Sequence, residues 1–173
     1  MELRDAAPAD LPAIQAIYAH HVLHGLASFE EVPPDVEELR RRFDDVLGRG
    51  LPYLVATEGS EVLGYGYCAP YRLRTAYRYA LEDSIYVRHG LQGRGIGSRL
   101  LAELLARCES LGYRQVLAVI GDSANAASIG LHERHGFLRV GTFRSVGYKF
   151  GRWVDSVLMQ RPLGAGDGTP PAT

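Results

Sequence analysis

A predicted strand, a glycine-rich turn and a predicted helix follow one another in the stretch Ile85-Tyr86-Val87-Arg88-His89-Gly90-Leu91-Gln92-Gly93-Arg94-Gly95-Ile96-Gly97-Ser98-Arg99-Leu100-Leu101. The start of a helix offers unpaired backbone N–H groups and the positive end of the helix dipole, and both favour a phosphate. Glycines carry no side chain, so a pyrophosphate can lie directly on the backbone of such a turn. The stretch therefore predicts an anion-binding turn, with Gln92 and Arg94 as additional donors at its rim.

Two common phosphate-binding motifs do not fit this turn. A Walker loop carries Lys and then Ser or Thr after its last glycine, whereas this chain has Ile96-Gly97-Ser98 there. The dinucleotide fingerprint G-x-G-x-x-G also fails, because Gly93, Gly95 and Gly97 recur at every second residue. Taken alone, the turn leaves a second interpretation open, which is a tight connection that binds no ligand.

Strands and helices share the rest of the chain in an order typical of a layered α+β fold. The apolar pattern predicts strands at residues 3–6, 53–57, 62–70, 79–87, 116–120, 137–148 and 153–160. It predicts helices that start near residues 10, 35, 98 and 124, and Gly48 and Gly112 end the second and third of them. We expect a mixed central sheet with helices on both of its faces, an α/β/α arrangement.

The composition excludes several classes of protein. The 173 residues suffice for one domain, placed at residues 1–163, and the Gly- and Pro-rich residues 164–173 predict a disordered tail. With 19 basic and 20 acidic residues, the chain lacks the basic excess of a dedicated nucleic-acid binder. It has no apolar run of roughly 18 residues, so no membrane association is expected. The cysteines Cys68 and Cys108 have apolar neighbours and predict reduced, buried thiols in a cytoplasmic protein.

Two motifs of the chain resemble those of the GNAT family of N-acetyltransferases. The glycine turn matches the family's acetyl-CoA signature, whose core is Q/R-x-x-G-x-G/A. The second motif of the family, an Asn helix that ends in Gly-Phe, is similar to the stretch Asn125-Ala126-Ala127-Ser128-Ile129-Gly130-Leu131-His132-Glu133-Arg134-His135-Gly136-Phe137. The resemblance extends to about Leu163 and implies a GNAT-like sheet and an acetyl-CoA-dependent transfer to an amine.

The resemblance also implies which residues bind the cosubstrate acetyl-CoA. Its pyrophosphate would lie on the turn, and its pantetheine arm would run beside the strand that ends at Val87. Asn125, which the sequence also predicts as the N-cap of a helix, would contact the pantetheine. The cofactor-binding residues implied in this way are Ile85, Tyr86, Val87, Gln92, Gly93, Arg94, Gly95, Ile96, Gly97, Ser98, Asn125 and Ser128.

Three further segments are similar to one subfamily, and they span residues 72–77, 82–87 and 147–155. The subfamily comprises the phosphinothricin N-acetyltransferases and the related methionine sulfone and sulfoximine acetyltransferases, which acetylate the α-amine of glutamate- and methionine-like amino acids. The resemblance implies a homodimer and a small, amino-acid-like substrate, whose anionic groups would bind two arginines of the first segment. The implied substrate-binding residues are Arg72, Leu73, Arg74, Tyr77, Glu82, Asp83 and Ser84.

Glu82 is the candidate general base of this chemistry. An α-ammonium group is mostly protonated at neutral pH, so a base must take its proton before the nitrogen attacks a thioester. A salt bridge with an arginine is the alternative role for Glu82, and Asp83 points to the opposite face of the strand by the two-residue period. Backbone N–H groups at the end of the strand, residues 85–87, would stabilise the oxyanion.

His132 stands where many members of the family carry a tyrosine that protonates the departing thiolate. A histidine can donate a proton near neutral pH, so His132 is the second candidate catalytic residue, and a packed helical histidine is the alternative interpretation. His20 and His24 have the i, i+4 spacing of metal ligands. Because no third ligand is in evidence and the chemistry needs no metal, we expect an exposed helix face there and no metal site.

Two other functions stay open. An acetyltransferase of a polyamine, an aminoglycoside or a protein N-terminus would keep the cosubstrate, although Arg72 and Arg74 disfavour a cationic acceptor. A CoA-binding sensor or an inactive relative with a structural role would be favoured by loss of Glu82 or of the glycines, and the chain retains both.

Overall fold

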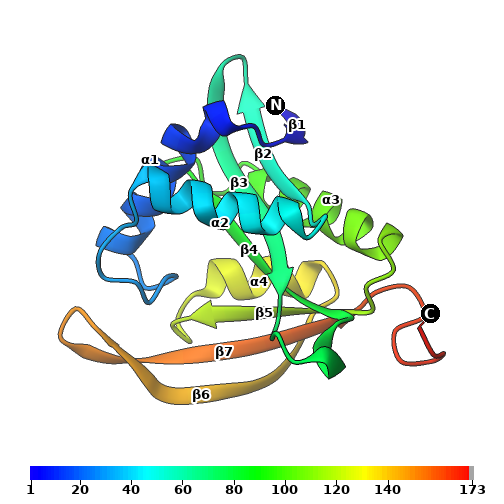
Figure 1. Cartoon of the computed structure of the whole chain (residues 1–173). Coiled ribbons are helices and arrows are strands. Elements are labelled where there is room, and N and C mark those ends of the chain that lie inside the picture. The colour runs from blue at the N-terminus through cyan, green and yellow to red at the C-terminus, as the bar shows by residue number, and fades with distance from the viewer. Residues whose placement is uncertain (172–173) are drawn as a thin grey trace.

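Seven strands form one sheet, and helices cover both of its faces (Figure 1). The structure, a computed structural model, describes residues 1–171. Its strands are β1 (Glu2–Asp5), β2 (Tyr53–Glu58), β3 (Glu61–Pro70), β4 (Ala80–Val87), β5 (Gln115–Gly121), β6 (Leu138–Lys149) and β7 (Arg152–Pro162). Its helices are α1 (Leu11–His24), α2 (Val36–Gly48), α3 (Ile96–Ser110) and α4 (Ala126–Arg134), with short 3-10 turns η1 (Pro8–Asp10) and η2 (Thr75–Tyr77). The predicted α+β fold is confirmed.

Two antiparallel halves of the sheet meet at strands β4 and β5. The strand order is β1-β2-β3-β4-β5-β7-β6, and β4 and β5 run parallel to each other. Within residues 1–171 the pairing of β4 with β5 covers three residue pairs, from Ala80 to Glu82 of β4. Beyond Glu82, β4 stays paired with β3 as far as Val87, and β5 stays paired with β7 as far as Gly121. The two strands therefore separate, and their facing backbone edges border a gap.

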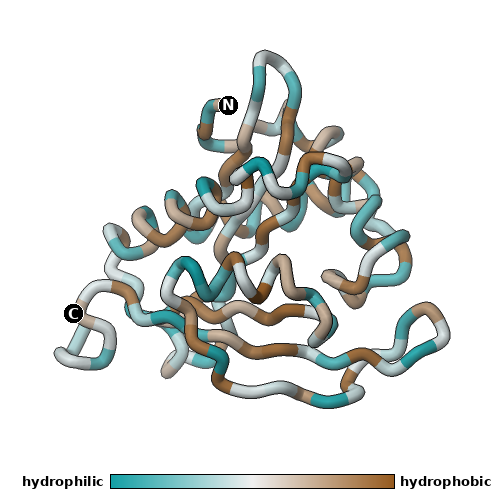
Figure 2. Tube along the Cα trace, turned by 180° about the vertical axis from the view of Figure 1, so that it is seen from behind, coloured by the Kyte–Doolittle hydropathy of each residue, from teal (hydrophilic) through white to brown (hydrophobic). Residues whose placement is uncertain are grey.

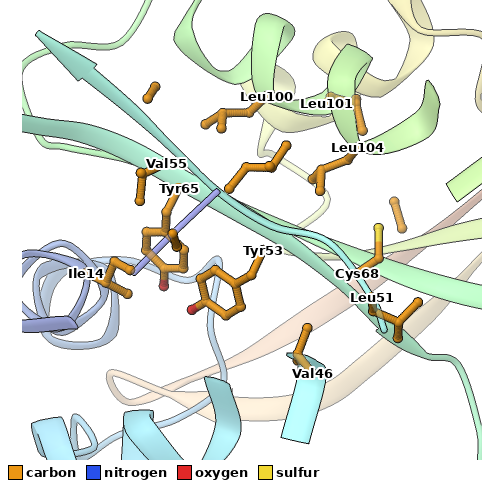
Figure 3. Close-up of a cluster of buried hydrophobic side chains, with 14 of the residues drawn as sticks. Ile14, Val46, Leu51, Tyr53, Val55, Tyr65, Cys68, Leu100, Leu101 and Leu104 are labelled. Atoms are coloured by element: carbon orange, nitrogen blue, oxygen red, sulfur yellow. The ribbon is translucent and has the colours of Figure 1, made fainter. Parts of the chain in front are cut away.

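Alternate residues of β3 face different helices. Tyr65 points toward α1 and α2, and its ring stacks on that of Tyr53 with the ring centres 6.0 Å apart. Gly64 and Gly66 point the other way, toward α3. Figure 3 shows this division, with the leucines of α3 on one side of the strands and Ile14 on the other. The core thus has two layers, one on each face of the sheet.

Two glycines let α3 pack closely on β3. A Cβ atom on Gly64 would lie 2.9 Å from the carbonyl oxygen of Tyr86 and 3.1 Å from a methyl carbon of Ile96. On Gly66 it would lie 3.0 Å from a methyl carbon of Leu104. These distances leave no room for a side chain, so glycine is needed where the helix approaches the strand. The close packing of α3 also sets the position of the turn that precedes it.

The last described residues fold back against the start of β5. Arg114 donates hydrogen bonds to the carbonyl oxygens of Gly166 and Pro170 and to the hydroxyl of Thr169, each over 3.1 Å. The sequence predicts disorder over residues 164–173, of which 164–171 include these contacts and 172–173 lie outside the described residues. The division of the chain after residue 163 stays a prediction. No helix within residues 1–171 combines the length and the apolar character needed to cross a membrane.

The loop between α1 and α2 lies over the open end of the gap between β4 and β5. A Cβ atom on Gly121, the last residue of β5, would lie 2.1 Å from the carbonyl oxygen of Leu26 in this loop. Lys149, at the end of β6, donates a hydrogen bond of 2.7 Å from its buried Nζ to the carbonyl oxygen of Ser28. Both contacts join the loop to the half of the sheet that β5, β7 and β6 form.

Replacing Gly121 by alanine should destabilise the fold, because the new methyl group would overlap the backbone of Leu26. Overpacking of this kind costs about 1–3 kcal/mol of the free energy of unfolding, and we expect Gly121→Ala to fall in that range. The matched control is Gly141→Ala in β6, where nothing lies within 4 Å of the added Cβ atom. Urea unfolding measures both effects, and equal stability of the two variants would contradict the close approach of the loop.

Candidate active site

A cavity of about 1040 Å³ occupies the place where the gap between β4 and β5 opens toward α3 and α4. Its wall combines the glycine turn, the first turns of both helices, the end of β4 and the end of α1. With the exception of Arg94, the predicted cofactor-binding residues all line this cavity: Ile85, Tyr86, Val87, Gln92, Gly93, Gly95, Ile96, Gly97, Ser98, Asn125 and Ser128. Segments far apart in the sequence thus form one concave surface.

The glycine turn has a backbone conformation that other residues rarely adopt. Gly93 and Gly95 have φ angles of 79° and 77°, and nothing lies within 4 Å of a Cβ atom built on either. Gly95 is the N-cap of α3, so the backbone N–H groups of Ile96, Gly97 and Ser98 have no acceptor within the helix. An open backbone at the positive end of a helix dipole fits the oxygens of a phosphate.

The two polar residues at the rim of the turn have different surroundings. Gln92 lines the cavity, and its Oε1 accepts a hydrogen bond of 2.9 Å from the backbone N–H of Gly90, which helps to fix the turn. Arg94 lies outside the cavity wall, and its guanidinium group is 3.7 Å from the carboxylate of Glu58. Both partners of this ion pair are more than half exposed, so the pair contributes little to stability.

Strand β4 presents its side chains alternately to the two faces of the sheet. Ile85 and Val87 face α3, each with a methyl carbon 3.7 Å from the Cβ position of Gly97. Tyr86 faces α1, and its ring packs edge-on against that of Tyr18 with the ring centres 5.0 Å apart. Because β5 has separated here, the backbone edge of β4 is free to bind an extended ligand in place of a strand.

Asn125 begins α4 as the sequence predicts. Its side-chain oxygen accepts a hydrogen bond of 3.1 Å from the backbone N–H of Ser128, and its backbone is the N-cap of the helix. Both residues also line the large cavity. The cap fixes the first turn of α4 against the gap between β4 and β5.

Sequence reasoning missed residues that α1 and the last hairpin contribute to the cavity. His21 lines it and donates a hydrogen bond of 2.8 Å from Nε2 to the carbonyl oxygen of Val87. His24 and Arg152 line it as well. No local motif links these residues, since 66 positions separate His21 from Val87. Among the described residues, no group of three or more His, Cys, Asp or Glu is arranged to hold a metal ion.

A smaller cavity of about 280 Å³ adjoins the large one where β4 and β5 separate. Ser128 and His132 belong to the walls of both cavities. Glu82, Asp83 and Ser84, which are predicted substrate-binding residues, line the smaller one. The glycine turn and the candidate base therefore border two adjoining cavities whose walls share residues at the gap in the sheet.

Glu82 is partly buried at this junction, on the face of the sheet that α1 and α2 cover. Burial raises the pKa of its carboxyl group, and the negative charge of Asp83 raises it further, whereas the positive charge of Arg72 acts in the opposite direction. A carboxylate with a raised pKa holds a proton more strongly and is a better general base. The position therefore suits proton abstraction.

Asp83 and His132 meet on the opposite face, as the two-residue period predicts for Asp83 relative to Glu82. The Nε2 atom of His132 lies 3.0 Å from a carboxylate oxygen of Asp83, and the side chains are 5% and 2% exposed. Its Nδ1 atom lies 2.8 Å from the carbonyl oxygen of Ser128. Burial, the largest effect, works against the charged imidazole, but Asp83 and the Ser128 carbonyl together raise the pKa of His132.

The loop between β3 and β4, which contains η2, carries the other predicted substrate-binding residues. These residues are exposed and lie outside both cavities: Arg72, Leu73, Arg74 and Tyr77. The loop leads directly into β4, and Arg72 is close enough to Glu82 to act on its pKa. Arg72 therefore lies near the candidate base without forming the wall of its cavity.

Comparisons with known proteins agree with this geometry. A model of the acetyltransferase (GNAT) family matches residues 17–137 of the chain. Over 162 residues the chain is 59% identical to the phosphinothricin N-acetyltransferase of Alcaligenes faecalis. This match covers 94% of this chain and 82% of that protein. It is 43% identical to the L-methionine sulfoximine/L-methionine sulfone acetyltransferase of Pseudomonas aeruginosa, with 93% of this chain and 94% of that protein covered.

A solved structure gives the same agreement in three dimensions. It is a GNAT superfamily phosphinothricin acetyltransferase from Sinorhizobium meliloti in complex with AcCoA, and it superimposes with a TM-score of 0.96 at 48% sequence identity. The match covers 99% of this chain and 92% of that one. The two chains therefore share one fold over nearly their whole length.

The stability that His132 provides should depend on pH. Its pKa is raised in the folded protein, so this contribution is complete below the pKa of an unfolded histidine and is lost as the pH rises through the folded value. We expect His132→Gln to lower the free energy of unfolding more at about pH 5.5 than at about pH 9, on either side of the ordinary histidine pKa.

Urea unfolding at the two pH values measures this difference. A double-mutant cycle with Asp83→Asn assigns the pH-dependent part to the pair. The same loss at both pH values would show that His132 carries no additional proton in the folded protein.

Proposed function

Since the chain belongs to the acetyltransferase (GNAT) family, we propose that it transfers the acetyl group of acetyl-CoA to the α-amine of an amino-acid-like small molecule. The chain is an N-acetyltransferase, and the proposal concerns its acceptor and the residues that act on it. The pair of adjoining cavities that extends from the glycine turn to Glu82 is the observation that carries the proposal. It joins a site for phosphates to a site for proton abstraction across the gap in the sheet.

We assign acetyl-CoA to the large cavity. The N–H groups at the start of α3, with Gly93 and Gly95, suit the pyrophosphate because they offer donors without side chains. The free edge of β4 suits the amides of the pantetheine arm, which would take the hydrogen bonds that β5 no longer makes. Asn125 and Ser128 extend this surface at the start of α4. The acetyl-CoA complex of the Sinorhizobium meliloti relative supports the assignment.

Glu82 is the general base in this proposal. An acceptor amine must lose a proton before its nitrogen attacks the thioester carbonyl, and Glu82 lines the smaller cavity next to the gap. Its raised pKa favours uptake of that proton, directly or through a water molecule. Backbone N–H groups on the free edge of β4 would stabilise the oxyanion that forms, an effect worth a few kcal/mol in other enzymes.

His132 is the proposed acid for the departing thiolate. A thiol has an ordinary pKa of about 8.5, so a histidine whose pKa is raised above its ordinary value is matched to this step. His132 lines both cavities, which places it where the cosubstrate and the acceptor would meet.

An amino acid with a second anionic group is the proposed acceptor. Arg72 and Arg74 are exposed on the loop that leads into β4, and Arg72 lies near Glu82. Guanidinium groups bind carboxylates and phosphinates well because they donate two parallel hydrogen bonds. The names of the Alcaligenes faecalis and Pseudomonas aeruginosa relatives support acceptors such as phosphinothricin and methionine sulfoximine. The free, buried cysteines Cys68 and Cys108 support the further proposal of a cytoplasmic location.

Purified protein should consume acetyl-CoA with phosphinothricin, methionine sulfone or methionine sulfoximine as acceptor and form the N-acetyl product. Glu82→Gln should lower kcat by roughly 100- to 10,000-fold, because the amide cannot accept the proton. Release of the CoA thiol and mass spectrometry of the product measure activity. The matched control is Glu37→Gln, which changes an exposed carboxylate of α2.

Two outcomes would contradict this proposal. Acetylation of a polyamine or an aminoglycoside, with no α-amino acid acetylated, would overturn the acceptor class. Full activity of Glu82→Gln at every pH would overturn the assignment of the base.

We also propose a homodimer that forms along the last hairpin. Strand β6 is an edge of the sheet, and Figures 1 and 2 show the β6–β7 hairpin projecting from the body of the protein. Large apolar side chains along the hairpin are 55% to 72% exposed: Leu138, Val140, Phe143, Val146, Tyr148, Phe150 and Trp153. An apolar surface on an unpaired edge strand supports association with a second copy of the chain.

Sedimentation should show a dimer for the wild-type protein and a monomer for the variant with Val140→Asp and Phe143→Asp, because the charges would be buried without partners. The control is Val32→Asp, since Val32 is 80% exposed on a different loop. A wild-type protein that sediments as a monomer at every concentration would contradict the proposal.

A further inference from the structure

The buried pair of Asp83 and His132 connects the two halves of the sheet at the gap. Asp83 belongs to β4 and His132 to α4, which packs on β5. Their side chains are 2% and 5% exposed, and both residues line the smaller cavity together with Glu82. A buried charge is expensive unless a partner compensates it, so the protonation of this pair follows from its hydrogen bonds.

The hydrogen bonds of His132 determine where its protons lie. The carbonyl oxygen of Ser128 can only accept, so the Nδ1 atom of His132, 2.8 Å away, carries a hydrogen. The Nε2 atom faces the carboxylate of Asp83 at 3.0 Å, and one proton lies between these two atoms. With this proton on the ring, the pair consists of an imidazolium and a carboxylate and has no net charge.

Within residues 1–171, His132 is the hydrogen-bond partner of the Asp83 carboxylate, and the buried thiol of Cys68 lies opposite Asp83 on β3. The second oxygen of Asp83 is buried and makes no hydrogen bond within the described part of the chain, so its attraction acts on His132. The other groups around His132 are Phe137, whose ring packs edge-on 4.9 Å away, and His135, which is hydrogen-bonded to Ser98 of α3. Burial is the largest effect that lowers the pKa of His135, and the positive charges of Arg161, His132 and Arg134 lower it further.

We propose that Asp83 is a positioning residue that keeps His132 protonated, so that its Nε2–H group supplies the proton for the thiolate that leaves during acetyl transfer. This inference rests on the proposed function. In the step, the C–S bond of the tetrahedral intermediate breaks and its electron pair goes to sulfur. The Nε2–H group gives up its hydrogen bond to Asp83, its N–H bond breaks as the S–H bond forms, and the carbonyl of the new amide is restored. His132 becomes neutral, retains its Nδ1 hydrogen and regains a proton from water before the next turnover.

The charge of Asp83 acts on residues of both faces of the sheet. Its negative charge raises the pKa of His132 on one face and the pKa of Glu82 on the other. Activity requires an ionised Glu82 and a protonated His132. Protonation of Glu82 therefore lowers kcat at low pH, and deprotonation of His132 lowers it at high pH. Removal of the Asp83 charge lowers both pKa values, and the whole profile moves to lower pH. A residue with a merely structural role would reduce kcat at all pH values alike.

The test compares Asp83→Asn with the wild-type protein, and its control is Glu133→Gln, an exposed carboxylate next to His132 in the sequence. We expect both limbs of the kcat profile of Asp83→Asn to move down by roughly one pH unit, the usual effect of one nearby charge. Glu133→Gln should keep the wild-type profile. Limbs of Asp83→Asn that stay in place, or that move apart, would overturn the inference.

A second measurement separates this inference from the proposed function. Nitrogen NMR of the ligand-free protein, with labelled histidine, follows both ring nitrogens of His132 during a pH titration. In the wild-type protein His132 should keep both nitrogens protonated above about pH 6.5, the ordinary histidine value, and Asp83→Asn should titrate lower. A wild-type His132 that is neutral at pH 6.5, in an enzyme that acetylates amino acids, would overturn the inference alone. A protein that acetylates no amine would overturn the proposed function and the catalytic role of the pair with it.

Discussion

Strand β4 pairs with β5 over three residue pairs within residues 1–171, and the position of the last pair, at Glu82, determines where the site lies. A continuous parallel pair would use for sheet hydrogen bonds those backbone groups of residues 83–87 that point away from β3. Separation leaves them along a gap, so an extended ligand can take the place of the missing strand. The same gap connects the two faces of the sheet, which lets a cosubstrate on one face reach an acceptor on the other.

The gap persists because other contacts hold its two walls. On the β4 side, Gly64 and Gly66 allow α3 to pack tightly on β3, which places the glycine turn at the mouth of the large cavity. On the β5 side, Gly121 admits the backbone of Leu26, and the buried Lys149 holds Ser28 of the same loop. The walls are thus fixed by tight packing and buried polar contacts, while the ligand-binding edges stay unpaired.

Sequence reasoning succeeded where the physics is local. The glycine turn, the start of α4 at Asn125 and the opposite directions of Glu82 and Asp83 follow from helix starts and from the two-residue period of a strand. It failed where a contact depends on packing between distant segments. Nothing in the sequence around Gly121 indicates that the backbone of Leu26 packs against it. The 49 positions between Asp83 and His132 likewise hide their hydrogen bond.

Glu82 and Asp83 also show how one strand can supply acid and base chemistry from neighbouring residues. Adjacent side chains of a strand lie on opposite faces, so two carboxylates next to each other in sequence meet different surroundings. Glu82 faces the α1 and α2 side with a raised pKa, and Asp83 faces α4, where His132 compensates its charge. Such divergent environments are the means by which enzymes give similar groups different roles. The gap adds the remaining requirement, since the smaller cavity is bordered by both carboxylates and by His132.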